Sequence, residues 1–222
     1  MKNVSAQQVQ KYLADENYLT EKELADKTGT TAENILNMEE LQCIPAATYV
    51  VTGQMIVTSS FGEYQLPIES ERYYHPSVVS WVSEALEFAD KYDLGEVAKM
   101  VRENFDNRFS AALDGESPPW PDGADYAWNY ITDGTWGLCL KSVDMDHILT
   151  KEYARAAIRE LMVPETSENL TSEERNRLIE SIKSYRKVAL PFAPHEFPES
   201  STEREVNPAI RKYKLTAEEL ST

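Results

Sequence analysis

The sequence predicts a mostly helical α+β protein. Apolar residues recur at steps of three and four through most of the chain, which is the pattern of amphipathic helices. Residues 48–68 differ, because β-branched and aromatic residues are frequent there and Gly53 and Gly62 interrupt them. We therefore expect one β-hairpin in a helical chain: a winged-helix-like unit, made of a helix-turn-helix and the hairpin, packed on a helical body.

Three short helices are expected over residues 5–41. Ser5 can cap the first helix, and Thr20 with Glu23 forms a capping box that begins the second. Gly29 lies where the chain must turn into the third helix. The hairpin comes directly after this third helix, which is the position of a wing.

The opening resembles the helix-turn-helix of MerR-type regulators. The resemblance lies in Leu-Ala-x-x-Thr-Gly-Thr-Thr-x-x-x-Ile at residues 24–35, followed by Gln-Cys-Ile-Pro at 42–45. A helix that reads DNA needs basic and amide side chains toward bases and phosphates. Residues 31–41 contain no Lys or Arg, and they include Glu33, Glu39 and Glu40. We expect a packing or docking module with no autonomous DNA binding.

The helical body is expected to contain four longer helices. They begin near Pro76, after Gly95, at Thr150 and at Thr171, and Pro164 is expected to stop the third of them. Between the second and third, a Pro-rich breaker leads into a short aromatic segment that contains Tyr126, Trp128 and Tyr130.

The chain is expected to divide into three parts. Residues 1–70 form the winged-helix-like unit, and residues 71–190 form the helical body with its Gly-Thr-Trp-Gly-Leu-Cys segment. Prolines at 191, 194, 198 and 208 predict an extended Pro-rich tail at 191–222, which wraps the body or is partly disordered.

Composition excludes several classes of function. Asp and Glu outnumber Lys and Arg by 38 to 22, and the net charge of −16 repels polyanions. No apolar run approaches the roughly 18 residues of a membrane span, and the first residues do not resemble a signal peptide. We expect an acidic, cytoplasmic protein with no membrane partner, whose cysteines, Cys43 and Cys139, are reduced.

Residues 133–141 are the stretch around which the rest of the chain is interpreted. Gly134 and Gly137 are spaced as Gly-x-x-Gly, beside Trp136, Cys139 and Lys141. Glycine is unfavourable in a regular element, so this spacing suits a backbone that turns at positive φ or passes close to another group.

Two readings of this stretch stay open. In the first, it is the site of a cysteine-dependent enzyme, with Cys139 as nucleophile, Lys141 lowering the thiol pKa and His147 as base. In the second, the thiol is a small buried hydrophobe. A metal site from Asp144, Asp146, His147 and Cys139 does not match a known ligand spacing, so we expect no metal and no cofactor.

A pocket for a ligand is the other possibility for this region. Small-molecule sites have mostly apolar walls with a few polar groups, whereas aromatic residues also build cores. The candidate ligand-binding residues are Tyr73, Tyr74, His75, Trp128, Asp133, Thr135, Trp136 and Lys141.

Several segments together resemble an uncharacterised bacterial family associated with natural-product biosynthesis. They are Tyr-Leu-Thr at 18–20, Ser-Phe-Gly-Glu at 60–63, Tyr-Tyr-His-Pro at 73–76 and Gly-Thr-Trp-Gly-Leu-Cys at 134–139. The family pattern has Tyr where this chain has Trp136, and the match spans most of residues 18–160. The resemblance implies an accessory or binding protein that recognises a small molecule, a carrier or a partner enzyme through this aromatic region; the cysteine-dependent enzyme is the alternative.

Overall fold

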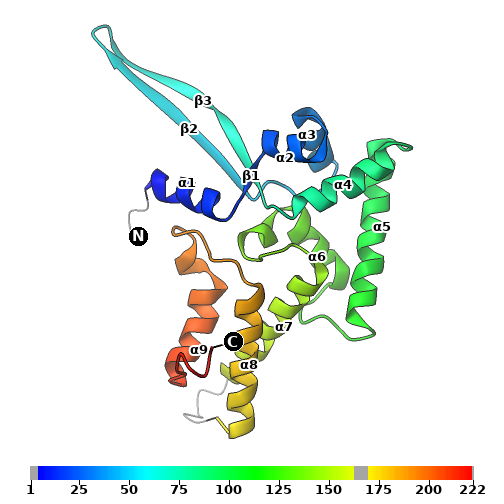
Figure 1. Cartoon of the computed structure of the whole chain (residues 1–222), viewed down its shortest axis with the longest axis vertical. Coiled ribbons are helices and arrows are strands. Elements are labelled where there is room, and N and C mark those ends of the chain that lie inside the picture. The colour runs from blue at the N-terminus through cyan, green and yellow to red at the C-terminus, as the bar shows by residue number, and fades with distance from the viewer. Residues whose placement is uncertain (1–4, 163–169, 222) are drawn as a thin grey trace.

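A computed structural model describes residues 5–162 and 170–221, with the backbone alone at 54–59 and 64–69. It confirms the mostly helical α+β class (Figure 1). The helices are α1 Ala6–Asp15, α2 Glu21–Thr28, α3 Ala32–Glu40, α4 Val78–Ala89, α5 Leu94–Leu113, α6 Gly123–Thr132, α7 Met145–Met162, α8 Ser172–Val188 and α9 Asn207–Lys212. The strands are β1 Leu19–Thr20, β2 Tyr49–Ser59 and β3 Gly62–Tyr74.

The three N-terminal helices form as predicted, because their caps are local. The Ser5 side chain accepts a hydrogen bond from the Gln8 N–H, and Thr20 and Glu23 form the expected capping box. Gly29 ends α2 with a φ of 71°, a left-handed conformation that favours glycine.

The hairpin is longer than predicted and projects from the body. β3 continues to Tyr74, where its last two residues pair with β1, and the antiparallel strand order is β1-β3-β2. A bulge lies between Val51 and Gly53, and Gly62 follows the turn. Residues 50–72 extend away from the helices (Figure 1), and we call them the arm.

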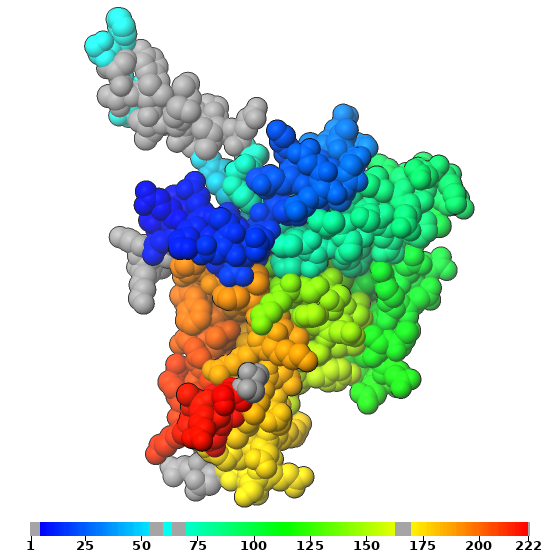
Figure 2. Space-filling model, in the orientation of Figure 1, coloured from blue at the N-terminus to red at the C-terminus, as the bar shows by residue number. Residues whose placement is uncertain are grey.

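Two main clusters of buried side chains hold the helices together. The first takes Leu24 and Ile35 from the N-terminal helices together with Val82, Phe105 and Ile148 from the body. The second joins α7 and α8 to the C-terminal segment. In Figure 2, α1 lies against the segment that follows α8, where Tyr12 and Leu13 pack on Leu190 and Ala193.

The C-terminal segment is not the extended tail that its prolines predicted. It contains a 3₁₀ turn at Phe197–Glu199, a π-helical turn at Thr202–Val206, and α9. Pro208 lies in the first turn of α9, where its missing N–H costs nothing. Val206, Ala209 and Tyr213 are buried against α7 and α8, so apolar residues at helical spacing outweigh the prolines.

The structure adds one helix to the predicted body and corrects the start of another. The short aromatic segment is a helix, α6, which buries Ala127, Trp128 and Ile131 on one face. α7 begins at Met145 instead of Thr150, because the Asp144 carboxylate accepts a hydrogen bond from the His147 N–H at 2.9 Å and caps the first turn. Pro164, expected to stop this helix, lies outside the described residues. Within the described residues, no helix has both the length and the apolar character needed to cross a bilayer.

Candidate functional site

The Gly-Thr-Trp-Gly segment packs against the chain that leads from α3 into β2. Gly134 has a φ of 77°, and a Cβ there would lie 3.0 Å from the Ala46 carbonyl oxygen. A Cβ at Gly137 would lie only 2.2 Å from the Thr48 Oγ1. The glycines therefore let two backbone segments approach more closely than other residues would allow. We call residues 134–137 and 46–48 the joint, because they connect the N-terminal unit to the body.

Hydrogen bonds complete this joint. The Ala46 N–H donates to the Thr132 carbonyl at 3.2 Å, and the buried Tyr18 hydroxyl donates to the Gly137 carbonyl at 2.7 Å. Burial raises the pKa of Tyr18, so its hydroxyl stays a neutral donor at physiological pH.

His75 is part of the same packed region. Its ring is buried beside Tyr18, with the two ring centroids 5.9 Å apart. The Nδ1 atom accepts a hydrogen bond from the Ser77 N–H at 3.1 Å, and the ring also bonds to the backbone of Leu140. Burial lowers the pKa of His75 to about 4, so the ring is neutral at pH 7. Both nitrogens are therefore occupied by structural bonds.

Tyr73 and Tyr74 bond to carboxylates outside the joint. The Tyr74 hydroxyl donates to the Glu39 carboxylate, which also pairs with Arg72 at 2.6 Å. The half-buried Tyr73 donates its hydroxyl to Glu71. Tyr74 is fully buried, so of these two tyrosines only Tyr73 offers surface to a ligand.

The three residues of the cysteine-enzyme hypothesis have other partners. Cys139 is 6% exposed, and its thiol lies 3.8 Å from the Trp136 carbonyl oxygen, which accepts its hydrogen bond. Lys141 donates to the Arg186 and Lys187 carbonyls at the end of α8. The His147 Nδ1 pairs with Asp144 at 2.8 Å. In the part of the chain that the structure describes, neither Lys141 nor His147 bonds to the thiol.

The remaining predicted residues divide between core and surface. Trp128 is buried against Phe105, with the ring centroids 5.1 Å apart, and Trp136 is 3% exposed. The exposed Asp133 accepts a hydrogen bond from the Thr135 N–H at 2.8 Å, which closes a turn. None of the eight predicted ligand-binding residues lines the cavity described next.

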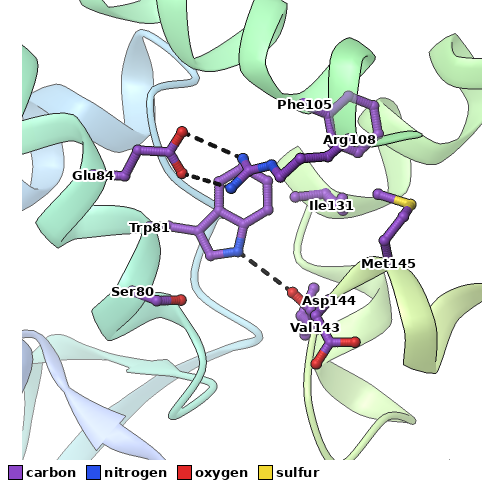
Figure 3. A pocket seen from close by; sticks show the side chains of 9 residues that line it. All are labelled: Ser80, Trp81, Glu84, Phe105, Arg108, Ile131, Val143, Asp144 and Met145. Carbon is purple, nitrogen blue, oxygen red and sulfur yellow. Dashed lines mark hydrogen bonds and ion pairs between the residues drawn. The ribbon is translucent and has the colours of Figure 1, made fainter. Parts of the chain in front are cut away.

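A different cavity lies between α4, α5, α6 and the start of α7 (Figure 3). Its volume is about 130 Å³, and we call it the Trp81 pocket. Trp81, Phe105 and Ile131 supply apolar walls, and the Trp81 Nε1–H donates to the Val143 carbonyl at 3.4 Å. The lining residues are Ser80, Trp81, Glu84, Phe105, Arg108, Ile131, Val143, Asp144 and Met145.

Charged groups surround the opening of this pocket. The Arg108 guanidinium bonds to Glu84 at 2.9 Å and lies 5.4 Å from the centre of the Trp81 ring (Figure 3). Partial burial raises the pKa of Asp144, but hydrogen bonds from Ser142 and His147 outweigh it and hold that pKa below its usual value. The lining therefore carries two carboxylates against one guanidinium.

Sequence reasoning missed the Trp81 pocket. Glu84 and Arg108 lie on different helices, and only the packing of α4 on α5 brings them together. The available signal was weak: Trp81 and Glu84 lie one helical turn apart on a helix expected to be amphipathic. Among the described residues, no three His, Cys, Asp or Glu side chains are grouped so that they could hold a metal ion.

The fold and this pocket define a helical α+β protein with a small, partly polar cavity in its body. The chain belongs to a family of unknown function, DUF6058, which matches residues 101–214, just over half of its length. The match includes the joint residues 134–137 and the C-terminal segment up to residue 214, whereas the expected resemblance spans most of residues 18–160. Searches of curated proteins and of solved structures found no match.

Proposed function

We propose that the protein is a binding or accessory protein of natural-product biosynthesis, which recognises a small molecule, a carrier or a partner enzyme. The observation that carries the proposal is the Trp81 pocket, an apolar cavity with charged groups at its opening. The biosynthetic setting rests on the sequence resemblance alone. Trp136 and Tyr74 are buried, so we place recognition at this pocket and not at the Gly-Thr-Trp-Gly segment.

The lining favours a ligand group with an apolar body and a hydrogen-bond-donating head. Trp81 and Met145 keep some accessible apolar surface in the pocket, whereas Phe105 and Ile131 are almost fully buried. The Glu84 and Asp144 carboxylates are acceptors, and Arg108 already donates to Glu84. A primary amine would complement this excess of acceptors, whereas a carboxylate would meet two like charges.

The cysteine-dependent enzyme remains the alternative. Its nucleophile, Cys139, lies in a turn that packs on the N-terminal unit, and its expected helpers, Lys141 and His147, bond elsewhere. A thiol nucleophile needs a cation or a base within reach, so this arrangement gives the alternative less support than the binding role.

We also propose roles for the N-terminal part. Its order α1, β1, α2, α3, β2, β3, with β1 paired to β3, supports a winged-helix-like unit with a MerR-like opening that serves for docking. The boundaries at residues 70 and 190, and a cytoplasmic location, stay proposals. Two unpaired, buried cysteines support that location.

The NMR signals of the indole N–H groups of the four tryptophans test recognition at the Trp81 pocket. Loss of one signal in Trp81→Phe and of another in Trp120→Phe assigns the two reporters. We then titrate the protein with phenethylamine, and with 3-phenylpropionate as the matched acid. The proposal predicts that the amine shifts the Trp81 signal, that Arg108→Ala alters this shift, and that the acid has little effect. If both probes leave Trp81 unchanged, or if they shift only Trp120, recognition at this pocket is wrong.

A further inference from the structure

The arm has an open edge along its length. β1 pairs with β3 only at Tyr73 and Tyr74, so among the described residues β2 is an edge strand throughout, and β3 is a second edge strand from Gly62 to Arg72. Unpaired edge strands associate readily with other chains. A two-stranded hairpin that projects from the body is also only marginally stable in water. Both arguments indicate that the arm is covered in the working protein.

One strand of the arm lacks the charge that the rest of the surface carries. The uncharged part is the β2 half: no charged residue occurs from Leu41 to Gly62, although 27% of the whole chain is charged and its net charge is −16, whereas the β3 half carries Glu63, Glu69, Glu71 and Arg72. Val50 and Val51 are 50% and 40% exposed, and Phe61 at the tip is 89% exposed. Few charges and exposed aromatic and aliphatic residues are typical of the centre of a protein interface. The composition therefore favours a protein as the occupant.

An apolar groove lies at the base of the same arm, between α1 and β2. Its volume is about 390 Å³, and the residues that line it are Ser5, Ala6, Val9, Leu13, Tyr49, Val50, Val51 and His195. None of these eight residues is Asp, Glu, Lys or Arg. The groove thus matches the tip of the arm in character, and it lies one arm's length away from it.

We propose that the arm forms a two-fold symmetric dimer of this chain, in which two β2 strands run antiparallel and Phe61 of each copy occupies the partner's basal groove. A two-fold axis near the middle of the arms must place the tip of one arm at the base of the other. One symmetric contact therefore pairs the β2 edges of both copies and fills both grooves, which a single foreign strand would not do.

The size of this contact fits a reversible dimer. Ten to eleven strand residues span about 35 Å, and a strip about 10 Å wide along them covers about 350 Å² per copy. Insertion of a Phe adds about 150–250 Å² per copy. The total of roughly 1,000–1,200 Å² is at the lower end of specific interfaces. Each copy carries a net charge of −16, so the two copies repel each other at low salt. Added salt screens this repulsion and should therefore strengthen the dimer.

Sedimentation velocity of the full chain tests the dimer. We expect a monomer–dimer equilibrium in the micromolar range that tightens between 50 and 300 mM NaCl. Phe61→Asp should raise the dissociation constant at least about 30-fold, as loss of an anchor residue does. Tyr92→Asp, at an exposed residue outside the arm and its groove, is the matched control and should leave it unchanged. Equal thermal melting curves of both variants and the wild type show that the fold is kept.

Disulfide trapping tests the arrangement of the copies. Ser60→Cys copies are mixed with Ala6→Cys copies and oxidised; both sites are exposed, and the native Cys43 and Cys139 are buried. We expect mixed Ser60→Cys–Ala6→Cys dimers and none with Ser172→Cys, at the far end of α8 (Figure 1). The proposal is overturned if the chain is a monomer up to about 100 μM or if Phe61→Asp leaves the dimer unaffected. It is also overturned if disulfides form mainly between two Ser60→Cys tips, or if the arm binds another protein while the chain stays monomeric.

Discussion

Replacement of Gly137 by Ala should destabilise the protein through one contact. The new Cβ would lie 2.2 Å from the Thr48 Oγ1 and 3.3 Å from the Thr48 and His75 Cβ atoms. Thr48 can rotate or shift, but His75 is buried and held by hydrogen bonds on both sides of its ring. Overpacking of this kind costs about 1–3 kcal/mol, and the lost backbone freedom of Gly in the unfolded chain returns about 0.4–1 kcal/mol. We expect a net loss of about 1–2 kcal/mol.

A double-mutant cycle in urea separates this contact from general effects. Thr48→Ala removes the Oγ1, so Gly137→Ala/Thr48→Ala should lie within about 1 kcal/mol of Thr48→Ala alone, with a coupling of about 1–2 kcal/mol. Gly95→Ala is the matched control, because its Cβ would meet only the Asp93 side chain, at 3.2 Å. Gly137→Ala as stable as the wild type, or a double variant no better than Gly137→Ala, would refute the close packing at the joint.

Three further predictions concern His75, the C-terminal segment and α3. The pKa of His75 is about 4 in the folded chain and about 6.5 in the unfolded chain. Between these pH values the unfolded chain binds more protons, so the free energy of unfolding falls as the pH drops through this window, by about 3 kcal/mol at most. Urea unfolding at pH 5 to 7 should therefore show a steeper loss of stability in the wild type than in His75→Gln. The Tyr213 hydroxyl donates to the Leu161 carbonyl at 2.7 Å in a buried site. In the same assay, Tyr213→Phe should lower the free energy of unfolding by about 1–2 kcal/mol, whereas the control Tyr92→Phe should leave it unchanged. Equal stabilities of the two variants would mean that the segment after α8 does not dock. Because α3 exposes Glu33 and Glu40 and carries no Lys or Arg, titration of random duplex DNA at low salt should give no binding tighter than about 1 μM, and tight binding abolished by Lys22→Ala/Lys27→Ala would contradict this.

Local signals in the sequence predicted the N-terminal helices and the need for glycine in the 133–141 stretch. The capping residues Ser5 and Thr20 act within one helical turn, so they can be recognised in the sequence without knowledge of the tertiary structure. The glycine spacing indicated either positive φ or a close approach, and Gly134 shows the first and Gly137 the second. The partner segment at 46–48 is far away in the sequence, and no local pattern identifies it.

Tertiary packing explains what the sequence did not predict. The prolines after residue 190 suggested an extended tail, but burial of Val206 and Tyr213 against α7 and α8 holds that segment in helical turns. The Trp81 pocket depends on side chains from separate helices, such as Glu84 and Arg108. Cys139 looked reactive because Lys141 is close in sequence, yet the Lys141 side chain turns to the end of α8.

Alkylation of the two native cysteines tests most directly the claim that the 134–139 segment is a packed joint and not a reactive site. Cys43 is an internal reference, because it is fully buried and burial raises its pKa to about 11. The folded protein is treated with iodoacetamide at pH 7.5, and the modification of each cysteine is followed by peptide mass spectrometry with and without urea. We predict that Cys139 reacts as slowly as Cys43 until the protein unfolds. Rapid modification of Cys139 alone in the folded chain would contradict the claim and favour the cysteine-dependent enzyme.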